Sequence, residues 1–377
     1  MRTRKKKTFH LLIIKSLSLF RRFTGGKSRP IPKTSFDSIL LISTTAIGDT
    51  LLSTPVFTAF REQNPSANIK ALIKDKFCPM FQDNPDINGV IPFHKGFAGF
   101  LKTLFEIRKD RFQAAFVLHT SDPNPVFLCT LANIPLIVGK SYDSSLNGLY
   151  TKVVTPNPKD HAIVRRMLVA KTIYPDRKSW PSTLVLPLRP EKIDATHRQF
   201  QAISGLPTQY DLVVGFQPGA SREFKMWPAD NFIDLGKRLL SQNPRIGILI
   251  LGAPNEKHLG KSIEDGIGDC SRARSLCGAT PLTDLPYLTE RLDCLVTNDT
   301  GTLHIAIAVK TPTVSLFVPT DVPGTGPYQD LDIHRVVSKP RPCGDDCVRK
   351  KCTKTPPCMT LITVDEVYQA VIDTLAL

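Results

Sequence analysis

Hydrophobic and polar positions along the chain follow two alternating patterns. Short runs rich in Ile, Leu and Val are typical of strands that are buried on both faces. Between them lie longer segments in which apolar residues recur every three or four positions, as they do in amphipathic helices. This alternation predicts parallel sheets with helices packed on both faces.

The pattern also places the individual elements. In the first half it predicts helices at 51–61 and 97–108 and strands at 38–42, 69–73, 89–93 and 114–118. In the second half it predicts helices at 230–240 and 364–375 and strands at 212–216, 246–251, 294–297 and 313–317. The same rhythm therefore occurs twice in the chain.

A polar stretch at 175–210 separates the two halves and contains five prolines, as an interdomain linker would. We therefore predict an α/β protein with two Rossmann-like, doubly wound domains that face each other across a ligand cleft at the carboxyl ends of their strands. The predicted segments are an N-terminal arm at 1–36, a first domain at 37–185, a linker at 186–210, a second domain at 211–360 and a C-terminal helix at 361–377.

Charge is distributed unevenly over the 377 residues. The net charge is +15, and residues 1–36 contain eleven Lys and Arg and no acid. The apolar run at 11–14 is too short to cross a bilayer, and Arg21 and Arg22 stand where a signal peptide would need small residues. The arm is interpreted as a basic amphipathic segment for an anionic membrane surface, with a solvated terminus as the alternative. No zinc-finger or RNP motif follows it, so nucleic acid is not an expected partner.

The first predicted strand leads into a loop that contains an acid. Thr44 to Thr50 reads TTAIGDT, in which Gly48 allows close approach of the backbone to a ligand and Asp49 begins the next helix. Asp49 has two interpretations: a general base that accepts a proton from an attacking hydroxyl, or a residue that only caps the helix.

A second loop follows the strand at 212–216 and reads QPGASREFKMWP over 217–228. The small residues at 219–221, Ser221 among them, leave room for a ligand. Lys225 and Arg222 are candidate cations for a diphosphate, although Arg222 alone is more typical of a solvated loop charge. Pro228 suits the first position of the helix that follows.

The third candidate site is the segment CLVTNDTGTLHIAIAV at 294–309. Asp299-Thr300-Gly301 resembles the catalytic turn of an aspartic protease, but that chemistry needs two such turns. The chain contains one, so only a dimeric protease remains as that alternative. A strand, a Thr-Gly-Thr turn and an apolar helix instead predict an anion site at the helix N-terminus.

Four segments together resemble glycosyltransferase family 9, the lipopolysaccharide heptosyltransferases. They are AIGDTLLSTPVFTAFREQNP, GFQPGASREFKMWPADNF, LVTNDTGTLHIAIAVKTPTVSLF and CGDDCVRKKCTKTPPCMTLITVDEV. The resemblance runs from residue 38 to the end and implies a GT-B fold. It also implies inverting transfer of heptose, usually from ADP-heptose, to the lipid-linked core oligosaccharide, without a catalytic metal or other cofactor. The protein would then be peripheral, on the cytoplasmic face of the inner membrane.

The resemblance also implies roles for particular residues. Asp49 matches the general base, with Ala46 and Gly48 in the acceptor-side loop. The implied donor-binding residues are Ser221, Lys225, Glu256, Asp299, Thr300, Gly301, Thr302 and His304, with Lys225 on phosphate and Glu256 toward the nucleoside. Relatives often carry Arg near the end of the first strand, where this chain has Ser43-Thr44-Thr45. A different sugar or acceptor, and a non-catalytic saccharide- or lipid-binding scaffold, therefore stay open as alternatives.

Four of the nine cysteines cluster near the C-terminus, at Cys343, Cys347, Cys352 and Cys358. Their density suits a structural zinc site, but their spacing matches none of the common two-pair frameworks. Free thiols in a surface loop are the alternative interpretation.

Overall fold

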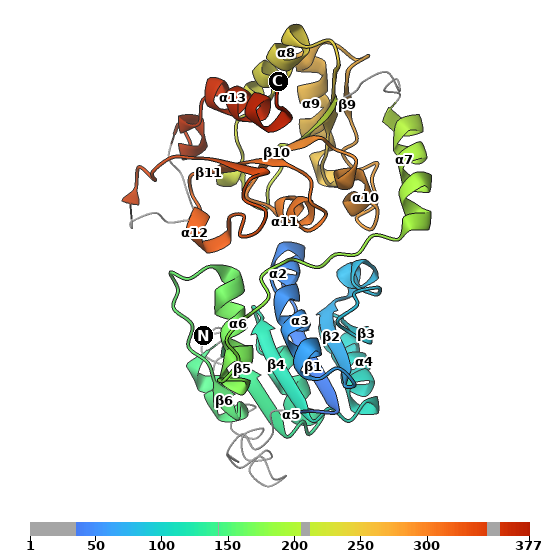
Figure 1. The fold of residues 1–377 in the computed structure, drawn as a ribbon, viewed down its shortest axis with the longest axis vertical. Helices are drawn as coiled ribbons and strands as arrows, with labels where there is room; N and C mark the ends of the chain where they lie inside the picture. Colours follow the sequence, from blue (N-terminus) through green and yellow to red (C-terminus); the bar gives the residue numbers. More distant parts are fainter. Residues whose placement is uncertain (1–34, 142, 205–211, 345–354) are drawn as a thin grey trace, which may run out of the picture. The chain divides into compact units, whose positions relative to one another are not determined.

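The computed structural model describes residues 35–141, 143–204, 212–344 and 355–377. Residues 1–34 of the basic arm, Cys347 and Cys352 lie outside the described residues. The chain divides into two units at Val185 and Leu186 (Figure 1). Among the described residues, no helix has the length and apolar content required to span a membrane.

The first unit is built on a parallel sheet with the strand order β3-β2-β1-β4-β5-β6. Its strands are β1 Ser38–Ser43, β2 Asn68–Lys74, β3 Gly89–Phe93, β4 Ala114–His119, β5 Leu136–Gly139 and β6 Lys152–Val153. Its helices are α2 Ile47–Leu51, α3 Thr54–Gln63, α4 Gly96–Lys109, α5 Asn124–Leu131 and α6 Ala162–Ile173. The strand order reverses between β1 and β4, and this is where doubly wound sheets bind their ligands.

The second unit repeats this topology with the strand order β12-β11-β10-β7-β8-β9. Its strands are β7 Leu212–Gln217, β8 Ile246–Ile250, β9 Ala273–Ser275, β10 Cys294–Asn298, β11 Thr313–Phe317 and β12 His334–Ser338. Its helices are α7 Pro190–Ser204, α8 Ala229–Gln242, α9 Lys257–Ile267, α10 Leu285–Glu290, α11 Gly301–Ala308, α12 Val322–Thr325 and α13 Val364–Leu375. The reversal here lies between β7 and β10, so the loops after these strands are adjacent.

Two sequence predictions differ from the observed elements. The helix predicted at 51–61 corresponds mainly to α3, which begins at Thr54, while the separate helix α2 ends at Leu51. Pro55 has no backbone N–H to extend α2 and lies at the second position of α3. The linker predicted at 186–210 contains α7, which opens at Pro190. This helix packs on α10 of the second unit, where the imidazole of His197 lies 3.0 Å from the carbonyl oxygen of Tyr287.

An aromatic cluster lies at the centre of the second unit's core. Phe232 of α8 is fully buried. Its ring centroid lies 5.5 Å from that of Phe216 in β7 and 4.9 Å from that of Trp227. The indole N–H of Trp227 donates to the carbonyl of Ile362, just before α13. The C-terminal helix is therefore tied to the same core as the loop after β7.

We expect Phe232→Ala to lower the free energy of unfolding of the second unit by about 3–5 kcal/mol, because it leaves a cavity between two aromatic rings. Leu331→Ala, at a side chain that is 63% exposed, is the matched control and should change it by less than about 0.5 kcal/mol. Urea denaturation followed by circular dichroism measures both. Equal effects of the two variants would contradict this assignment of the core.

Candidate active site

Asp49 lies at the carboxyl edge of the first sheet. Strand β1 ends at Ser43, a short loop follows, and Asp49 is the third residue of α2. The helix is capped by Ala46, so the alternative in which Asp49 caps the helix is wrong. Ala46 is exposed and Gly48 is buried. The carbonyl of Ala46 accepts hydrogen bonds from the backbone N–H and the hydroxyl of Thr50. The loop therefore holds the Asp49 carboxylate at the sheet edge with 31% of the side chain exposed.

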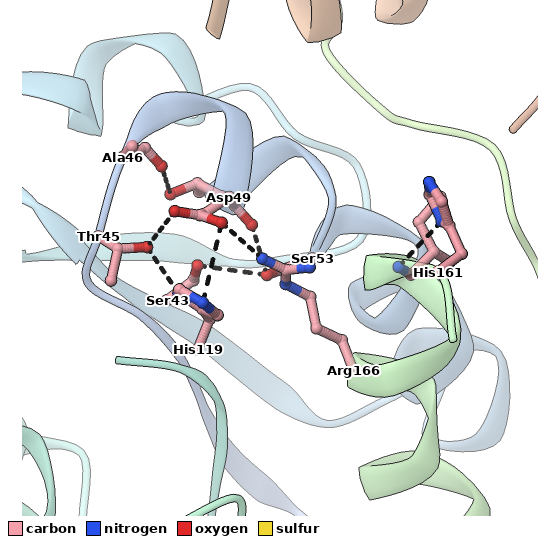
Figure 2. Close-up of polar contacts among 10 residues, drawn as sticks. Ser43, Thr45, Ala46, Asp49, Ser53, His119, His161 and Arg166 are labelled. Atoms are coloured by element: carbon pink, nitrogen blue, oxygen red, sulfur yellow. Dashed lines mark hydrogen bonds and ion pairs between the residues drawn. The ribbon is translucent and has the colours of Figure 1, made fainter. Parts of the chain in front are cut away.

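The carboxylate is paired with an arginine from a distant part of the chain. The Nη2 atom of Arg166, in α6, donates to Oδ1 of Asp49 at 2.8 Å, and the Arg166 side chain is only 4% exposed (Figure 2). Burial lowers the pKa of Arg166 to about 10, so the guanidinium is still charged at neutral pH. A buried guanidinium needs a counter-ion, and Asp49 supplies it. The sequence did not single out Arg166.

Two further side chains orient the carboxylate from the other side. The Thr45 hydroxyl donates to Oδ2 of Asp49 at 2.9 Å and lies 2.8 Å from Nδ1 of His119, at the end of β4. Since a hydroxyl has one proton and Thr45 gives it to Asp49, Nδ1 of His119 must donate to Thr45. The neutral imidazole therefore carries its proton on Nδ1. Sequence analysis also missed His119, although a histidine at the end of an apolar strand was an available signal.

The protonation states follow from these contacts. Burial would raise the pKa of Asp49, but His119, Arg166 and the Thr45 hydroxyl outweigh it, so the pKa lies below its ordinary value of 3.8. Burial and the charge of Arg166 lower the pKa of His119 to about 4. Because His119 is then neutral near pH 7, Arg166 is the cation that keeps Asp49 ionised there. The site thus presents a half-exposed carboxylate next to a fixed positive charge.

The second unit brings together three of the predicted donor loops. Strands β10, β7 and β8 are adjacent, so the loops that follow them meet at one edge of the sheet. The buried Asn298, at the end of β10, accepts from the backbone N–H of Trp227 at 3.0 Å and donates to the carbonyl of Pro218 at 2.8 Å. The Thr302 hydroxyl donates to Oε1 of Gln217 at 3.2 Å. These contacts fix the loop after β7 against the start of α11.

Lys225 and Asp299 form an ion pair in this cluster. The Nζ atom of Lys225 lies 2.6 Å from Oδ2 of Asp299, and the two side chains are 20% and 10% exposed. Thr300 is the N-cap of α11, but its hydroxyl oxygen accepts no hydrogen bond from the backbone N–H groups of the first turn. The helix residues Thr302 and His304 are buried. Asp299 thus holds the Lys225 ammonium beside the N-terminus of α11, which begins at Gly301.

Glu256 joins the same edge from the loop after β8. Its carboxylate accepts from the backbone N–H of Ala253 at 2.7 Å. A Cβ atom at position 219 would lie 2.0 Å from Oε1 of Glu256, so a larger residue there would displace the Glu256 carboxylate from its present position. Ser221, two residues farther on, is exposed. The space left by small residues at 219 is therefore occupied by Glu256.

The comparison with protein families is decisive at this point. The model of glycosyltransferase family 9 (heptosyltransferase) matches residues 106–356, more than half of the chain. The chain belongs to glycosyltransferase family 9. Membership makes it a glycosyltransferase and agrees with the two parallel six-stranded sheets of the GT-B fold.

Individual family 9 proteins match most of the chain. Lipooligosaccharide heptosyltransferase 2 of Haemophilus influenzae is 25% identical over 307 residues, covering 78% of this chain and 86% of that protein. Lipopolysaccharide heptosyltransferase 2 of Escherichia coli K12 is 25% identical over 305 residues, covering 77% and 85%. A family 9 structure from Veillonella parvula has a TM-score of 0.77 at 21% identity and covers 91% of this chain and 98% of its own. The structure of E. coli ADP-heptose lps heptosyltransferase II has a TM-score of 0.74 at 22% identity, with 90% and 98% covered.

The family and the geometry exclude the aspartic protease alternative. Asp299 directly follows the parallel strand β10 and is paired with the Lys225 ammonium, so it does not share a proton with a second carboxylate. Of the four clustered cysteines, Cys343 and Cys358 are half-buried and described. The described part of the chain has no group of three or more His, Cys, Asp or Glu placed to hold a metal ion. The zinc site itself stays a prediction, since Cys347 and Cys352 lie outside the described residues.

We expect the His119 imidazole to titrate with a midpoint near pH 4, well below its ordinary value of 6.5. The folded protein then binds fewer protons than the unfolded chain between these values, so stability falls as the pH drops from 6.5 toward 4. Removing a cation that lowers this pKa must raise it, so Arg166→Met should move the midpoint upward.

NMR of the imidazole Cε1–H signals measures this midpoint, with His119→Asn identifying the resonance. Lys140→Met provides a milder test at an exposed residue, because Lys140 also lowers the pKa but less than Arg166 does. A wild-type midpoint near 6.5, or no upward shift in either variant, would contradict the proposed electrostatics.

Proposed function

We propose that this family 9 glycosyltransferase moves heptose from ADP-heptose to a hydroxyl of the inner-core oligosaccharide of lipopolysaccharide, with inversion at the anomeric carbon. The relatives named above are lipooligosaccharide and lipopolysaccharide heptosyltransferases, and one of the similar structures is named for ADP-heptose. The observation that carries the proposal is the Asp49 carboxylate, which is ionised, partly exposed and held in place by Arg166.

Asp49 acts as the general base in this proposal. The acceptor hydroxyl attacks the anomeric carbon, the bond from that carbon to the β-phosphate oxygen of ADP breaks, and the hydroxyl proton passes to Asp49. A single displacement of this kind inverts the anomeric configuration. Arg166 and Thr45 hold the carboxylate by separate oxygens, so they are positioning residues for the base.

The donor diphosphate is assigned to the second unit. An ammonium group has three N–H donors, so Lys225 can keep its contact with Asp299 and still donate to a phosphate oxygen. The N-terminus of α11 at Thr300 to Thr302 adds backbone N–H groups and the positive end of a helix dipole. Both stabilise the negative charge that develops on the leaving ADP, and for this reason we propose that catalysis needs no metal ion. Glu256, against the backbone of Gly219, is assigned to the nucleoside side.

The proposal also covers the acceptor and the place in the cell where the enzyme works. An inner-core acceptor is linked to lipid, so the enzyme must work at a membrane surface, on the cytoplasmic face of the inner membrane. The eleven Lys and Arg of residues 1–36 suit contact with anionic lipid. Near Asp49, Lys140 and Arg165 are close enough to lower the pKa of His119 further, so the acceptor side carries positive charge as well.

Asp49→Asn should lower kcat for acceptor-dependent ADP release by about 10²–10⁴-fold, because the base is lost while the donor site is intact. The assay follows free ADP from ADP-heptose with and without a heptose-deficient core lipopolysaccharide. Asp75→Asn is the matched control, since Asp75 follows β2 at the same sheet edge but is 53% exposed. Thermal melting of each variant separates loss of chemistry from loss of fold.

The outcomes of this assay distinguish the alternatives. Unchanged ADP release in Asp49→Asn would overturn the assignment of the base. Donor binding without release would point to a different acceptor. Neither binding nor release would point to a different sugar, which a panel of nucleotide-sugars would identify, and no binding across that panel would indicate a scaffold.

Lys225→Met should raise the Kd for ADP by about tenfold or more, because a charge-assisted hydrogen bond to phosphate is lost. Lys237→Met, at an exposed residue of α8, removes the same charge elsewhere in the second unit and should leave the Kd unchanged. Isothermal titration calorimetry measures both. An equal Kd in the wild type and Lys225→Met would remove Lys225 from the donor site.

A further inference from the structure

Helix α4 of the first unit carries an apolar stripe that faces away from the core. Thr103, Leu104 and Ile107 form its buried side. Phe97, Leu101 and Phe105 are spaced four residues apart on another side and are 79%, 36% and 61% exposed. Among the described residues, Phe97 is the most exposed of the large apolar side chains. The helix therefore has a second apolar surface that the described residues of the first unit leave largely uncovered.

Positive charge borders this stripe. Residues 95–109 contain the cations Lys95, Lys102, Arg108 and Lys109 and a single acid, Glu106, which pairs with Lys109. The exposed side chains of the helix are thus apolar or basic. An exposed Phe/Leu stripe beside Lys and Arg is the composition of helices that lie in the headgroup region of anionic membranes.

The N-terminal end of this apolar stripe lies near the sheet edge that carries the candidate base, Asp49. Helix α4 begins just after β3, whose carboxyl end lies at the same sheet edge as helix α2 (Figure 1), and α2 carries Asp49. Lys74, at the end of β2, is within electrostatic range of both Lys95 and Asp49. A surface in contact with Phe97 and Lys95 therefore lies next to the acceptor side of the first unit.

We propose that the Phe97-Leu101-Phe105 stripe of α4 inserts into the headgroup region of an anionic lipid bilayer and brings the Asp49 edge of the sheet to the membrane surface. The inference rests on the proposed function in that it assigns the membrane contact of an enzyme with a lipid-linked acceptor. Charge favours the anionic bilayer over the two other occupants. A second copy docking through the same helix, or the basic segment 1–36, would set cations against cations.

Binding of the full-length chain to vesicles tests the proposal. Phe97→Ser/Phe105→Ser should weaken co-sedimentation with mixed phosphatidylglycerol–phosphatidylcholine vesicles by at least about tenfold, since two aromatic rings no longer leave water. Leu331→Ser, at an exposed residue of the second unit, is the matched control and should bind as the wild type does. Vesicles of phosphatidylcholine alone should bind all three proteins weakly.

A second measurement tests whether α4 itself contacts lipid, independently of residues 1–36. Tryptophan fluorescence of Phe97→Trp should be quenched by brominated lipid in anionic vesicles, while that of Leu331→Trp should not be. Binding without quenching at position 97 would overturn the proposal in favour of the basic arm, and self-association lost in the double variant would overturn it in favour of a second copy. With detergent-dispersed acceptor, ADP release should be the same in Phe97→Ser/Phe105→Ser as in the wild type. No ADP release by the wild type in this assay would contradict the proposed function, independently of vesicle binding.

Discussion

The candidate active site of the first unit depends on one ion pair, between Asp49 and Arg166. Arg166 is almost fully buried, and an unpaired guanidinium in that position would be strongly destabilising. The pair joins helix α2, which follows β1, to helix α6, and the two residues are 117 positions apart along the chain. Because the guanidinium requires a counter-ion, the same contact that holds the fold together also fixes the position and the charge of the carboxylate.

The second unit uses a related arrangement in a different place. Its acid, Asp299, follows β10, and its cation, Lys225, comes from the loop after the neighbouring strand β7. In the first unit the acid follows β1, the strand that corresponds to β7 in the repeated order. The two sheets therefore have the same topology, but their ion pairs are not related by the repeat. This difference agrees with the different tasks proposed for the two sites, a base in one and a phosphate contact in the other.

Local patterns predicted most of the fold, because buried parallel strands are continuous apolar runs. The strand predicted at 313–317 coincides with β11, and Val364 to Leu375 with α13. The short strands β5 and β6 were missed because four and two residues give too little periodicity. The break between α2 and α3 was also missed, although Pro55 marks it.

The candidate site was predicted only as far as its residues lie in sequence motifs. Asp49, Lys225 and Asp299 stand in the segments that follow strands β1, β7 and β10, where the topology makes polar residues informative. Arg166 stands in a helix next to Arg165, and no local signal shows which of the two is buried against a carboxylate. Its role depends on a tertiary contact, and such contacts are not encoded in the spacing of neighbouring residues.

The low pKa of Asp49 is consistent with the proposed chemistry. A general base works best with a pKa near the working pH, so a carboxylate whose pKa lies below 3.8 is a weak base by that criterion. In the proposed reaction, however, the negative charge of the donor diphosphate would raise the pKa of an unpaired carboxylate and favour its protonated, inactive form. Arg166 offsets this repulsion from a buried position where solvent screens it little. Under this proposal Asp49 is a weaker base, but it is still ionised when the anionic donor takes part in the reaction.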